Sequence, residues 1–512
     1  MIAADRQPAA WALSALLDGL IPWPGGPDLR ITGLTLDSRE LEPGWLFLAC
    51  QGTRGHGLAH GEAAKRAGAA AIVAEPTGEW DGTALARLAA DLSLPVIAAP
   101  GLGSLASALA DRFYGEPSRA LELVGVTGTN GKTSVSHVLA QALSDQVRCG
   151  LIGTLGFGFP DALQATFHTT PDPIRLQGHL AALRSAGARA VAMEVSSHAL
   201  AQERVAAVRF GIAVFTNLTR DHLDYHGDMN RYGAAKRRLF ETPGLGWAVL
   251  NRDDPFTHSL LSSLTPGAAR ALYSLRSDPP AAGVADLWVG ARSVEPRPRG
   301  LRLVVTTSLG DGEVEVGLLG RFNAANLLAV LTVLLARGQA LESALRALAR
   351  IRGVPGRMEC FGGPDTPLVV VDYAHTPDAL EQVLTHLRAH GGRRVLTVFG
   401  CGGERDRGKR PLMGRVAERL SDLVILTDDN PRHEDGSAII AEIRAGLADP
   451  SRVRIERQRA LAIRLALALA DRRDIVLVAG KGHETTQDMG DLEVHFSDRA
   501  QVMQALNEWG QR

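Results

Sequence analysis

Residues 121–134 read Leu-Glu-Leu-Val-Gly-Val-Thr-Gly-Thr-Asn-Gly-Lys-Thr-Ser. The apolar run 121–126 predicts a buried strand, and the residues from Lys132 onward predict a helix. Between them, glycines let the backbone wrap a phosphate, whose negative charge is favoured by successive N–H groups and by the helix N-terminus. The order of strand, glycine-rich loop and helix is therefore typical of an α/β protein that binds the phosphates of a nucleotide.

The loop departs at one position from the strict phosphate-loop pattern. That pattern has a glycine five residues before Gly131, and this chain has Val126 there. Gly-Lys-Thr is retained, so we expect Lys132 to reach the β- and γ-phosphates and Thr133 to offer its hydroxyl to Mg²⁺. The alternative is a glycine-rich turn that follows a buried strand and binds nothing.

The length and charge of the chain limit its class. At roughly 150 residues per domain, 512 residues predict three domains, which we place at 1–110, 111–351 and 352–512.

Lys and Arg number 55 against 56 Asp and Glu, so no excess of positive charge is present to hold a nucleic acid or an anionic membrane. The four cysteines form no CxxC pair, and no apolar stretch is long enough to cross a bilayer. We therefore expect a cytoplasmic protein.

Short apolar runs alternate with Ala- and Leu-rich stretches, which is the pattern of α/β folds. The first block has a β-rich run at 31–39. The central block has strand candidates at 190–195, 212–216 and 248–251, then a Gly- and Pro-rich stretch at 277–300 and a hairpin around 310–312. The last block repeats strand, loop and helix from strands at 368–373, 395–400, 423–427 and 475–479. We predict a smaller N-terminal α/β domain, a central phosphate-loop ATPase domain with a mostly parallel sheet, and a C-terminal Rossmann-like domain.

Polar residues with possible catalytic chemistry end two strands of the central block. Glu194 lies in an apolar strand, and His222 lies in Asn-Leu-Thr-Arg-Asp-His at 217–222. A carboxylate and an imidazole at strand ends suit Mg²⁺ and phosphate chemistry. Taken alone, His222 is better explained as a structural hydrogen-bonding histidine, and Lys236 as a solvated helix lysine.

Three polar loops follow strands of the last block, at 400–406, 428–432 and 480–484. They read Gly-Cys-Gly-Gly-Glu-Arg-Asp, Asp-Asp-Asn-Pro-Arg and Gly-Lys-Gly-His-Glu. Open parallel sheets bind ligands at such strand ends. Arginines pair with carboxylates and acidic side chains accept from ammonium groups, so the loops together suit an amino acid. Solvated turns are the alternative for each loop by itself. Cys401 has no partner histidine identifiable from sequence and is not taken as a nucleophile.

Taken together, the motifs resemble the Mur ligase family. Besides the phosphate loop, the resemblance rests on Glu-Val-Ser-Ser-His at 194–198, Asn-Leu-x-x-Asp-His-Leu-Asp-x-His-Gly at 217–227, Gly-Arg-Phe-Asn-Ala-Ala-Asn at 320–326 and Gly-Arg-Met-Glu at 356–359. Asp-Tyr-Ala-His-Thr-Pro at 372–377 and Asp-Asn-Pro-Arg at 429–432 narrow it to the members that add the third residue of the peptidoglycan peptide. The resemblance implies ATP-dependent ligation of meso-diaminopimelate to the D-glutamate of UDP-N-acetylmuramoyl-L-alanyl-D-glutamate through an acyl phosphate.

The resemblance also assigns site residues by position. The ATP site comprises Gly128, Thr129, Asn130, Gly131, Lys132, Thr133, Ser134, Asn323 and Arg357. The UDP-substrate site comprises Leu36, Ser38, Thr53, Arg54, Gly55, Thr169, Thr170, Ser196, Gln202 and Arg204. The diaminopimelate site comprises Arg405, Asp429, Asn430, Pro431, Arg432, Gly480 and Glu484. Lys132, Glu194, His222 and Lys236 are catalytic, and Mg²⁺ is assigned to Thr133, Glu194, His222 and Lys236. A carbamate formed from CO₂ on Lys236 would turn its ammonium into an anionic oxygen ligand.

Three alternatives stay open beside this assignment. A lysine-adding relative is disfavoured by Arg432, since lysine has no distal carboxylate. A folylpolyglutamate synthase-like ligase shares the loop and the chemistry but needs no first domain of this kind. A non-enzymatic nucleotide switch would leave Glu194, His222, Lys236 and the amino-acid loops unexplained together. We expect only small-molecule partners (ATP, the UDP-dipeptide and diaminopimelate) and a monomer. His168 stands where the resemblance leads us to expect asparagine.

Overall fold

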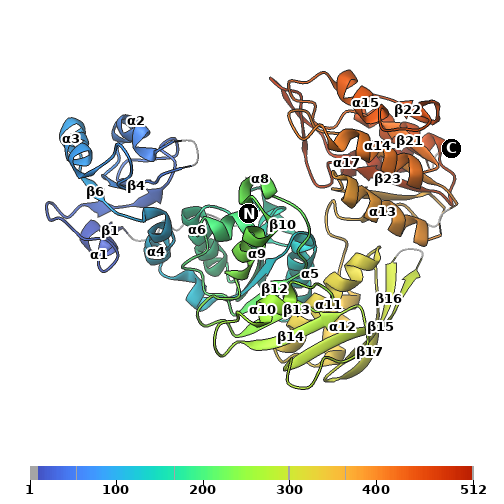
Figure 1. Ribbon diagram of the computed structural model, residues 1–512, viewed down its shortest axis with the longest axis horizontal. Helices are drawn as coiled ribbons and strands as arrows, with labels where there is room; N and C mark the ends of the chain where they lie inside the picture. Colours follow the sequence, from blue (N-terminus) through green and yellow to red (C-terminus); the bar gives the residue numbers. More distant parts are fainter. Residues whose placement is uncertain are drawn as a thin grey trace. The chain divides into compact units, whose positions relative to one another are not determined.

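The computed structural model describes residues 10–52, 55–166, 168–297, 300–363, 365–391 and 393–509. The chain forms two compact units, the first made mainly of residues up to Tyr273 and the second mainly of residues from Val289 onward. Both units are layered α/β structures (Figure 1), and the predicted three-domain α/β class is confirmed. No helix among the described residues is long and apolar enough to span a bilayer.

The N-terminal part of the first unit is built on a parallel sheet in the order β3-β4-β5-β6. Its strands are β3 (Gly33–Thr35), β4 (Trp45–Ala49), β5 (Ala71–Ala74) and β6 (Val96–Ala98), beside a small antiparallel pair, β1 (Trp11–Ala12) and β2 (Arg30–Ile31). Its helices are α1 (Leu13–Leu17), α2 (Gly61–Arg66), α3 (Gly82–Leu92) and α4 (Leu102–Phe113). The sheet is buried on both faces, because Leu46 and Leu48 join one apolar cluster and Phe47 joins another. The β-rich run predicted at 31–39 is too long. Strand pairing stops at Thr35, and the residues after it form a loop at the carboxyl edge of the sheet.

The rest of the first unit is built on eight strands of an 11-stranded sheet, in the order β10-β9-β8-β11-β7-β12-β13-β14. Its strands are β7 (Glu122–Thr127), β8 (Cys149–Gly153), β9 (Gly156–Phe159), β10 (Ala162–Gln164), β11 (Ala190–Glu194), β12 (Ile212–Phe215), β13 (Trp247–Asn251) and β14 (Ala269–Ser274). The six strands from β8 to β14 in this order pair in parallel with their neighbours, whereas β9 and β10 are antiparallel. The helices are α5 (Lys132–Ser144), α6 (Pro173–Ser185), α7 (Ser197–Ala201), α8 (Leu223–His226), α9 (Met229–Arg237) and α10 (Thr257–Leu261).

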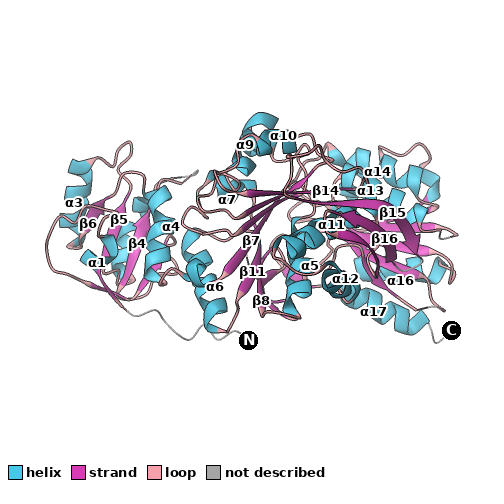
Figure 2. Cartoon of the chain, turned by 90° about the horizontal axis from the view of Figure 1, so that it is seen from below, coloured by secondary structure: helices cyan, strands magenta, loops and turns pink. Residues whose placement is uncertain are grey.

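Helices α5 and α6 flank the three strands β8, β11 and β7 (Figure 2). Leucines of α6, such as Leu176 and Leu180, pack with Leu123 of β7 and Val191 of β11 in one apolar cluster. Asp172 caps α6 by accepting hydrogen bonds from the N–H groups of the first turn, and Pro173 occupies the first helical position, where no N–H is needed. Strand β7 is therefore central and buried, which fixes the start of the loop that follows it.

The second unit begins with an antiparallel meander of β15 (Leu287–Arg297), β16 (Gly300–Thr307) and β17 (Gly310–Val316), followed by α11 (Arg321–Ala336) and α12 (Leu341–Ala349). The predicted hairpin around 310–312 is confirmed. The Gly- and Pro-rich stretch 277–300 needs a correction, since most of its second half is a strand. Alternate residues Leu287, Val289 and Ala291 are buried, and this burial outweighs the local Gly and Pro content.

The C-terminal sheet has the order β18-β19-β23-β20-β21-β22 and is parallel except for β18. Its strands are β18 (Glu359–Phe361), β19 (Leu368–Asp372), β20 (Val395–Phe399), β21 (Leu423–Leu426), β22 (Val453–Ile455) and β23 (Ile475–Ala479), and a hairpin of β24 (Thr486–Asp488) and β25 (Glu493–His495) follows. Two separate apolar clusters cover its faces. One involves α13 (Pro377–Ala389), α14 (Lys409–Leu420) and α15 (Gly436–Arg444), and the other α16 (Arg459–Leu469) and α17 (Asp498–Trp509). The four predicted strands are confirmed, and the three polar loops follow β20, β21 and β23.

Candidate active site

The phosphate loop follows β7 in the middle of the larger sheet of the first unit. Val126 belongs to the strand, where it is fully buried and pairs with Glu194 of β11 and Val214 of β12. The turn therefore starts later, at Gly128. The position at which the strict pattern has glycine lies within a strand here, so an ordinary buried valine fits it.

Two glycines give the loop its shape. Gly128 has φ +151°, and a Cβ placed there would lie 1.8 Å from Oγ1 of Thr216. Gly131 has φ +87° and stands just before α5. Side chains disfavour both conformations, so glycine is needed at both positions. Lys132, Thr133 and Ser134 consequently form the first turn of α5, where the helix N-terminus favours an anion.

The loop is held from the end of β12. The hydroxyl of Thr216 donates to the carbonyl oxygen of Asn130 at 2.6 Å. Asn217 accepts from the N–H of Asn130 through its side chain (2.9 Å) and from the N–H of Thr129 through its carbonyl (2.8 Å). Sequence reasoning missed both supports, although Asn217 opens the motif at 217–227. The backbone of this loop is thus held in its shape by residues at the end of β12.

Lys132 lies over the loop that precedes it. Its Nζ donates to the carbonyl oxygens of Gly128 and Thr129, each at 2.9 Å. The ammonium therefore stays beside the loop backbone, where it can neutralise the charge of a bound phosphate.

The carboxylate of Glu194 accepts a hydrogen bond from the first turn of α5. It ends β11 and is 1% exposed. Its Oε2 accepts from the hydroxyls of Thr133 (2.9 Å) and Thr154 (3.2 Å), and its Oε1 accepts from the N–H of Thr154 (2.7 Å). Mg²⁺ prefers oxygen ligands and is usually held by one or two carboxylates together with substrate phosphates, so the Glu194 and Thr133 oxygens fit it. Across the described ranges, no three His, Cys, Asp or Glu side chains gather into a metal site.

Lys236 is buried rather than solvated. It is 1% exposed on α9, its Nζ donates to the carbonyl oxygen of Gly128 at 2.8 Å, and the same atom lies 4.4 Å from the centre of the Tyr232 ring. Burial, followed by the nearby charge of Lys132, lowers the pKa of Lys236 well below its usual value. The simple interpretation of a solvated helix lysine is therefore wrong, and the amine is a candidate nucleophile.

His222 lies just before α8 with a left-handed backbone, φ +53°. Its ring centre is 4.9 Å from that of His198 and 6.1 Å from that of Tyr232, and its Nε2 is 3.3 Å from a carboxylate oxygen of Asp221. Tyr232 also places its hydroxyl 3.1 Å from Oγ1 of Thr129. This tyrosine, which the sequence analysis did not single out, contacts His222, Lys236 and the phosphate loop together.

Five of the residues assigned to the UDP-substrate, which lie between 169 and 204, form one hydrogen-bonded network that ends at Glu194. Arg204 donates to the side chain of Gln202 (2.6 and 2.9 Å) and to the carbonyl of Thr170 (2.8 Å). The Thr170 hydroxyl donates to the Glu194 carbonyl at 2.8 Å and accepts from the N–H of Ser196 at 3.0 Å. Thr169 joins through Thr154, with 3.0 Å between the two hydroxyl oxygens, and the neighbouring His168 is exposed. The structure thus brings these five predicted residues together.

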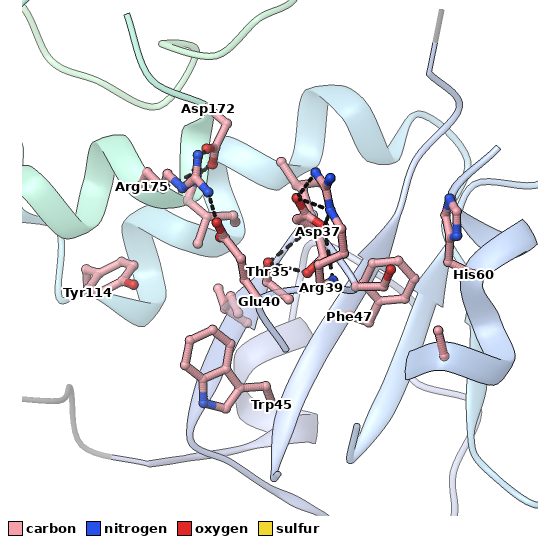
Figure 3. Close-up of a pocket in the computed structure, with 16 residues that line it drawn as sticks. Thr35, Asp37, Arg39, Glu40, Trp45, Phe47, His60, Tyr114, Asp172 and Arg175 are labelled. Carbon is pink, nitrogen blue, oxygen red and sulfur yellow. Dashed lines mark hydrogen bonds and ion pairs between the residues drawn. The ribbon is translucent and has the colours of Figure 1, made fainter. Parts of the chain in front are cut away.

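Leu36 and Ser38 line a cavity of about 670 Å³ at the carboxyl edge of the N-terminal sheet (Figure 3). Aromatic rings of Trp45, Phe47 and Tyr114 contribute apolar surface, which suits a ligand with a flat base and a polar sugar. Arg175 of α6 also lines the cavity, where it pairs with Asp172 and Glu40 (Figure 3). Sequence reasoning found Leu36 and Ser38 but missed the aromatic walls.

The predicted loop at 53–55 is only partly described. Thr53 and Arg54 lie outside the described residues. Gly55 is exposed, and its carbonyl accepts from the N–H of Gly52 at 2.9 Å. It is not among the residues that line the cavity.

In the second unit, the loops after β21 and β23 are joined by hydrogen bonds. Asn430 donates to Oε2 of Glu484 (3.0 Å) and accepts from Nζ of Lys481 (2.8 Å), while Lys481 also donates to Glu484 (2.9 Å). A Cβ at Gly480 would lie 2.4 Å from Oδ2 of Asp429, so only glycine allows this approach. Burial raises the pKa of Asp429, although the charges of Arg459 and Lys481 oppose that rise. Lys481 was quoted in the motif but not predicted as a site residue.

Arg432 connects this segment to the loop after β20. Its backbone is left-handed (φ +52°), and its Nη1 donates to the carbonyl of Gly403 at 2.7 Å. Arg405, in that loop, is exposed, whereas Pro431 is buried. Two arginines and several carboxylates therefore border the same loops, an arrangement that could bind a zwitterionic ligand.

Asn323 and Arg357, assigned to the nucleotide, both belong to the second unit. Asn323 is buried at the start of α11, where its side chain donates to the carbonyl of Leu319 (2.7 Å) and accepts from Asn326 (3.0 Å). The guanidinium of Arg357 lies 4.6 Å from the centre of the Tyr373 ring. Asn323 is therefore engaged in holding its own helix, and Arg357 stacks on an aromatic face.

The phosphate loop on a parallel sheet defines a nucleotide-binding α/β enzyme. Three family models match in order: Mur ligase family, catalytic domain at residues 30–101; Mur ligase middle domain at 126–334; and Mur ligase, glutamate ligase domain at 356–482. The chain belongs to the Mur ligase family.

Individual relatives are similar over almost the whole chain. A protein of Alkalilimnicola ehrlichii named UDP-N-acetylmuramoyl-L-alanyl-D-glutamate–2,6-diaminopimelate ligase is 51% identical over 97% of this chain and 99% of its own. A Pseudomonas aeruginosa protein of the same name is 51% identical over 94% and 96%. A solved structure with that name has a TM-score of 0.69 at 34% identity, over 98% of this chain and 99% of the other. Mycobacterium tuberculosis folylpolyglutamate synthase, at 18% identity and TM-score 0.59 over 74% of this chain and 92% of its own, shares the fold.

Proposed function

We propose that this chain is a cytoplasmic ATP-dependent ligase. It joins meso-diaminopimelate to the D-glutamate of UDP-N-acetylmuramoyl-L-alanyl-D-glutamate, a step of peptidoglycan precursor synthesis, and releases ADP and phosphate. The observation that carries the proposal is the Asp429–Arg432 segment, which presents an arginine among carboxylates in a chain 51% identical to ligases of this name. The division at 1–110, 111–351 and 352–512, and a monomeric state, are part of the proposal.

The reaction couples two displacements. The γ-carboxylate of D-glutamate attacks the γ-phosphorus of ATP, which forms an acyl phosphate and expels ADP. The amine of diaminopimelate then attacks the acyl carbon, expels phosphate and loses a proton. Lys132 stabilises the charge on the transferring phosphoryl group from the loop that binds it. Thr133 and Glu194 would hold Mg²⁺, which would neutralise phosphate charge as a Lewis acid.

We propose that Lys236 carries a carbamate, and the chemistry of its buried amine supports this. Only a neutral amine attacks CO₂, and burial lowers the pKa of this amine well below its usual value. The product is an anion whose oxygens can hold a cation. With His222 it would complete the proposed catalytic group of Lys132, Glu194, His222 and Lys236.

The substrate sites follow from the local geometry. The cavity at Leu36 and Ser38, with the loop at 53–55, would take the uridine nucleotide, and the network from Arg204 to Thr170 would hold the muramoyl dipeptide near Glu194. Asn323 and Arg357 remain proposed nucleotide contacts. For the amino acid, the seven residues Arg405, Asp429, Asn430, Pro431, Arg432, Gly480 and Glu484 remain the proposed site, in which Arg432 pairs with the distal carboxylate.

A lysine-adding enzyme is the second candidate. Arg432 disfavours it, because lysine has no distal carboxylate for this arginine to bind. The decisive experiment measures phosphate release from ATP in the presence of the UDP-dipeptide, with meso-diaminopimelate, lysine, glutamate or no amino acid. We expect strong stimulation by meso-diaminopimelate alone. Equal stimulation by lysine would contradict the substrate assignment, and stimulation by glutamate would favour folylpolyglutamate synthase-like chemistry.

A further inference from the structure

A carboxylate outside the proposed amino-acid site lies directly beside Arg432. Asp488 is the last residue of β24, and its side chain is 43% exposed. Its N–H donates to Oδ1 of Asn430 at 3.0 Å, and its carbonyl accepts from the N–H of Arg432 at 3.1 Å. Because the 430–432 segment holds both backbone groups, the position of this carboxylate relative to Arg432 is set by the backbone.

The side chain of Asp488 is oriented as well. Its Oδ1 accepts from the N–H of Gly490 at 3.0 Å, and its Oδ2 lies 3.3 Å from Nε of Arg432. Arg432, whose side chain is 21% exposed, uses Nη1 for the carbonyl of Gly403. Among the residues that the structure describes, its Nη2 makes no hydrogen bond. The guanidinium thus keeps donors for a second carboxylate while Nε faces Asp488.

The two acidic side chains of the proposed amino-acid site already face cations. Glu484 accepts from the buried Lys481, and Asp429 is buried within the electrostatic reach of Arg459 and Lys481. Asp488 pairs with Arg432 and with no second cation within the described parts of the chain. It is therefore the acidic group best placed to accept an ammonium from a ligand whose carboxylate binds Arg432.

We propose that Asp488 binds the distal ammonium of the incoming diamino acid while Arg432 binds the carboxylate on the same carbon. This inference rests on the proposed function and adds a specificity residue to it. The distal end of meso-diaminopimelate carries one cation and one anion, and Arg432 and Asp488 offer the opposite pair with 3.3 Å between Nε and Oδ2. The two side chains pair with each other, so neither charge lacks a partner.

Two groups are then recognised separately. Lysine would satisfy Asp488 and leave Arg432 without its carboxylate. The analogue 2-aminopimelate, which lacks only the distal ammonium, would satisfy Arg432 and leave Asp488 without its cation. A ligand that lacks either group should bind more weakly, since the partner left behind loses a charge-assisted hydrogen bond.

The test compares two ligands on three proteins. The efficiency kcat/KM is measured at saturating ATP and UDP-dipeptide with meso-diaminopimelate and with 2-aminopimelate. The proteins are the wild type, Asp488→Asn, which keeps the shape and an acceptor for the Gly490 N–H, and Asp491→Asn. Asp491 is exposed in the turn of the same hairpin, so it controls for the loss of one negative charge there.

We expect the wild type and Asp491→Asn to prefer meso-diaminopimelate by about 10- to 100-fold, the range for one charge-assisted hydrogen bond. Asp488→Asn should lose most of that preference through a higher KM for meso-diaminopimelate and keep its efficiency with 2-aminopimelate. An unchanged preference overturns the inference, and so does loss of activity with both ligands, which would show a structural role. A wild type that meso-diaminopimelate does not stimulate would instead overturn the proposed function, and this inference with it.

Discussion

Replacing Lys236 by arginine should remove a CO₂ adduct and most of the ligase activity with it. The change keeps a positive charge on α9 and an N–H donor near the Gly128 carbonyl, which Nζ of Lys236 approaches to 2.8 Å. A guanidinium stays protonated, however, and cannot be carbamylated under these conditions. The variant therefore separates a role of positive charge from a role of the neutral amine.

The size of the effect follows from the burial of Lys236. An ordinary lysine, with a pKa of about 10.4, is neutral in only about one molecule in a thousand at pH 7.4, and each unit by which the pKa falls raises that fraction about tenfold. Burial lowers the pKa of Lys236 well below its usual value, so its amine is available to CO₂ at a pH where exposed lysines are not. As pH falls through the lowered pKa, the amine takes up a proton and the adduct is lost. Activity should therefore fall on the acidic side.

The assay combines spectroscopy with kinetics. Protein equilibrated with ¹³C-bicarbonate should show one slowly exchanging carbamate carbon by NMR, absent from Lys236→Arg, and phosphate release by the variant should fall by about 100-fold or more. Lys65→Arg is the matched control, because Lys65 is exposed on α2. Full activity in Lys236→Arg would refute the reasoning, as would an identical carbamate signal in both proteins.

Three further changes test other parts of the site. Lys132→Ala should lower phosphate release by about 100- to 1,000-fold while the circular dichroism spectrum and Tm stay unchanged, because the charge facing the transferring phosphoryl group is lost and Nζ donates to carbonyls of its own loop; a folded variant with near wild-type turnover would remove Lys132 from the mechanism. Thr216→Val should raise the KM for ATP about tenfold by removing the 2.6 Å hydrogen bond to Asn130, and Thr216→Ser, which keeps the hydroxyl, should not. Arg432→Ala should lose about 10- to 100-fold in kcat/KM for meso-diaminopimelate, mainly through KM, with the KM for ATP and UDP-dipeptide unchanged; an unaltered KM for meso-diaminopimelate would contradict its pairing with the distal carboxylate.

The sequence predicted those parts of the fold in which local pattern and burial agree. Strand β7, the turn after it and the start of α5 follow from apolar residues and glycines that lie next to one another in the chain. The four strands of the C-terminal sheet were equally visible, because each is a short apolar run before a polar loop. Strand β15 was missed, since its Gly- and Pro-rich surroundings conceal the burial of alternate residues by tertiary packing.

The site residues show the same division. Lys132 and Glu194 could be found because a motif or a strand end marks them. Thr216 could not, because its hydroxyl meets the Asn130 carbonyl only after two strands pair in parallel. Lys236 alone looked like a surface lysine, and only its 1% exposure reveals the perturbed amine. Contacts between distant segments therefore decide which polar residues come together at the candidate site.

The close approaches of glycines in the C-terminal loops limit how this enzyme could change its amino-acid preference. A Cβ at Gly480 would meet Asp429 at 2.4 Å, one at Gly400 would meet the Thr427 carbonyl at 2.2 Å, and one at Gly403 would meet the Pro431 carbonyl at 1.9 Å. A first substitution at any of these positions disturbs the backbone before it alters selectivity. The side chains of Arg432 and Asp488, by contrast, are 21% and 43% exposed. Directed evolution toward another amino acid should therefore begin at those two side chains and leave the three glycines fixed.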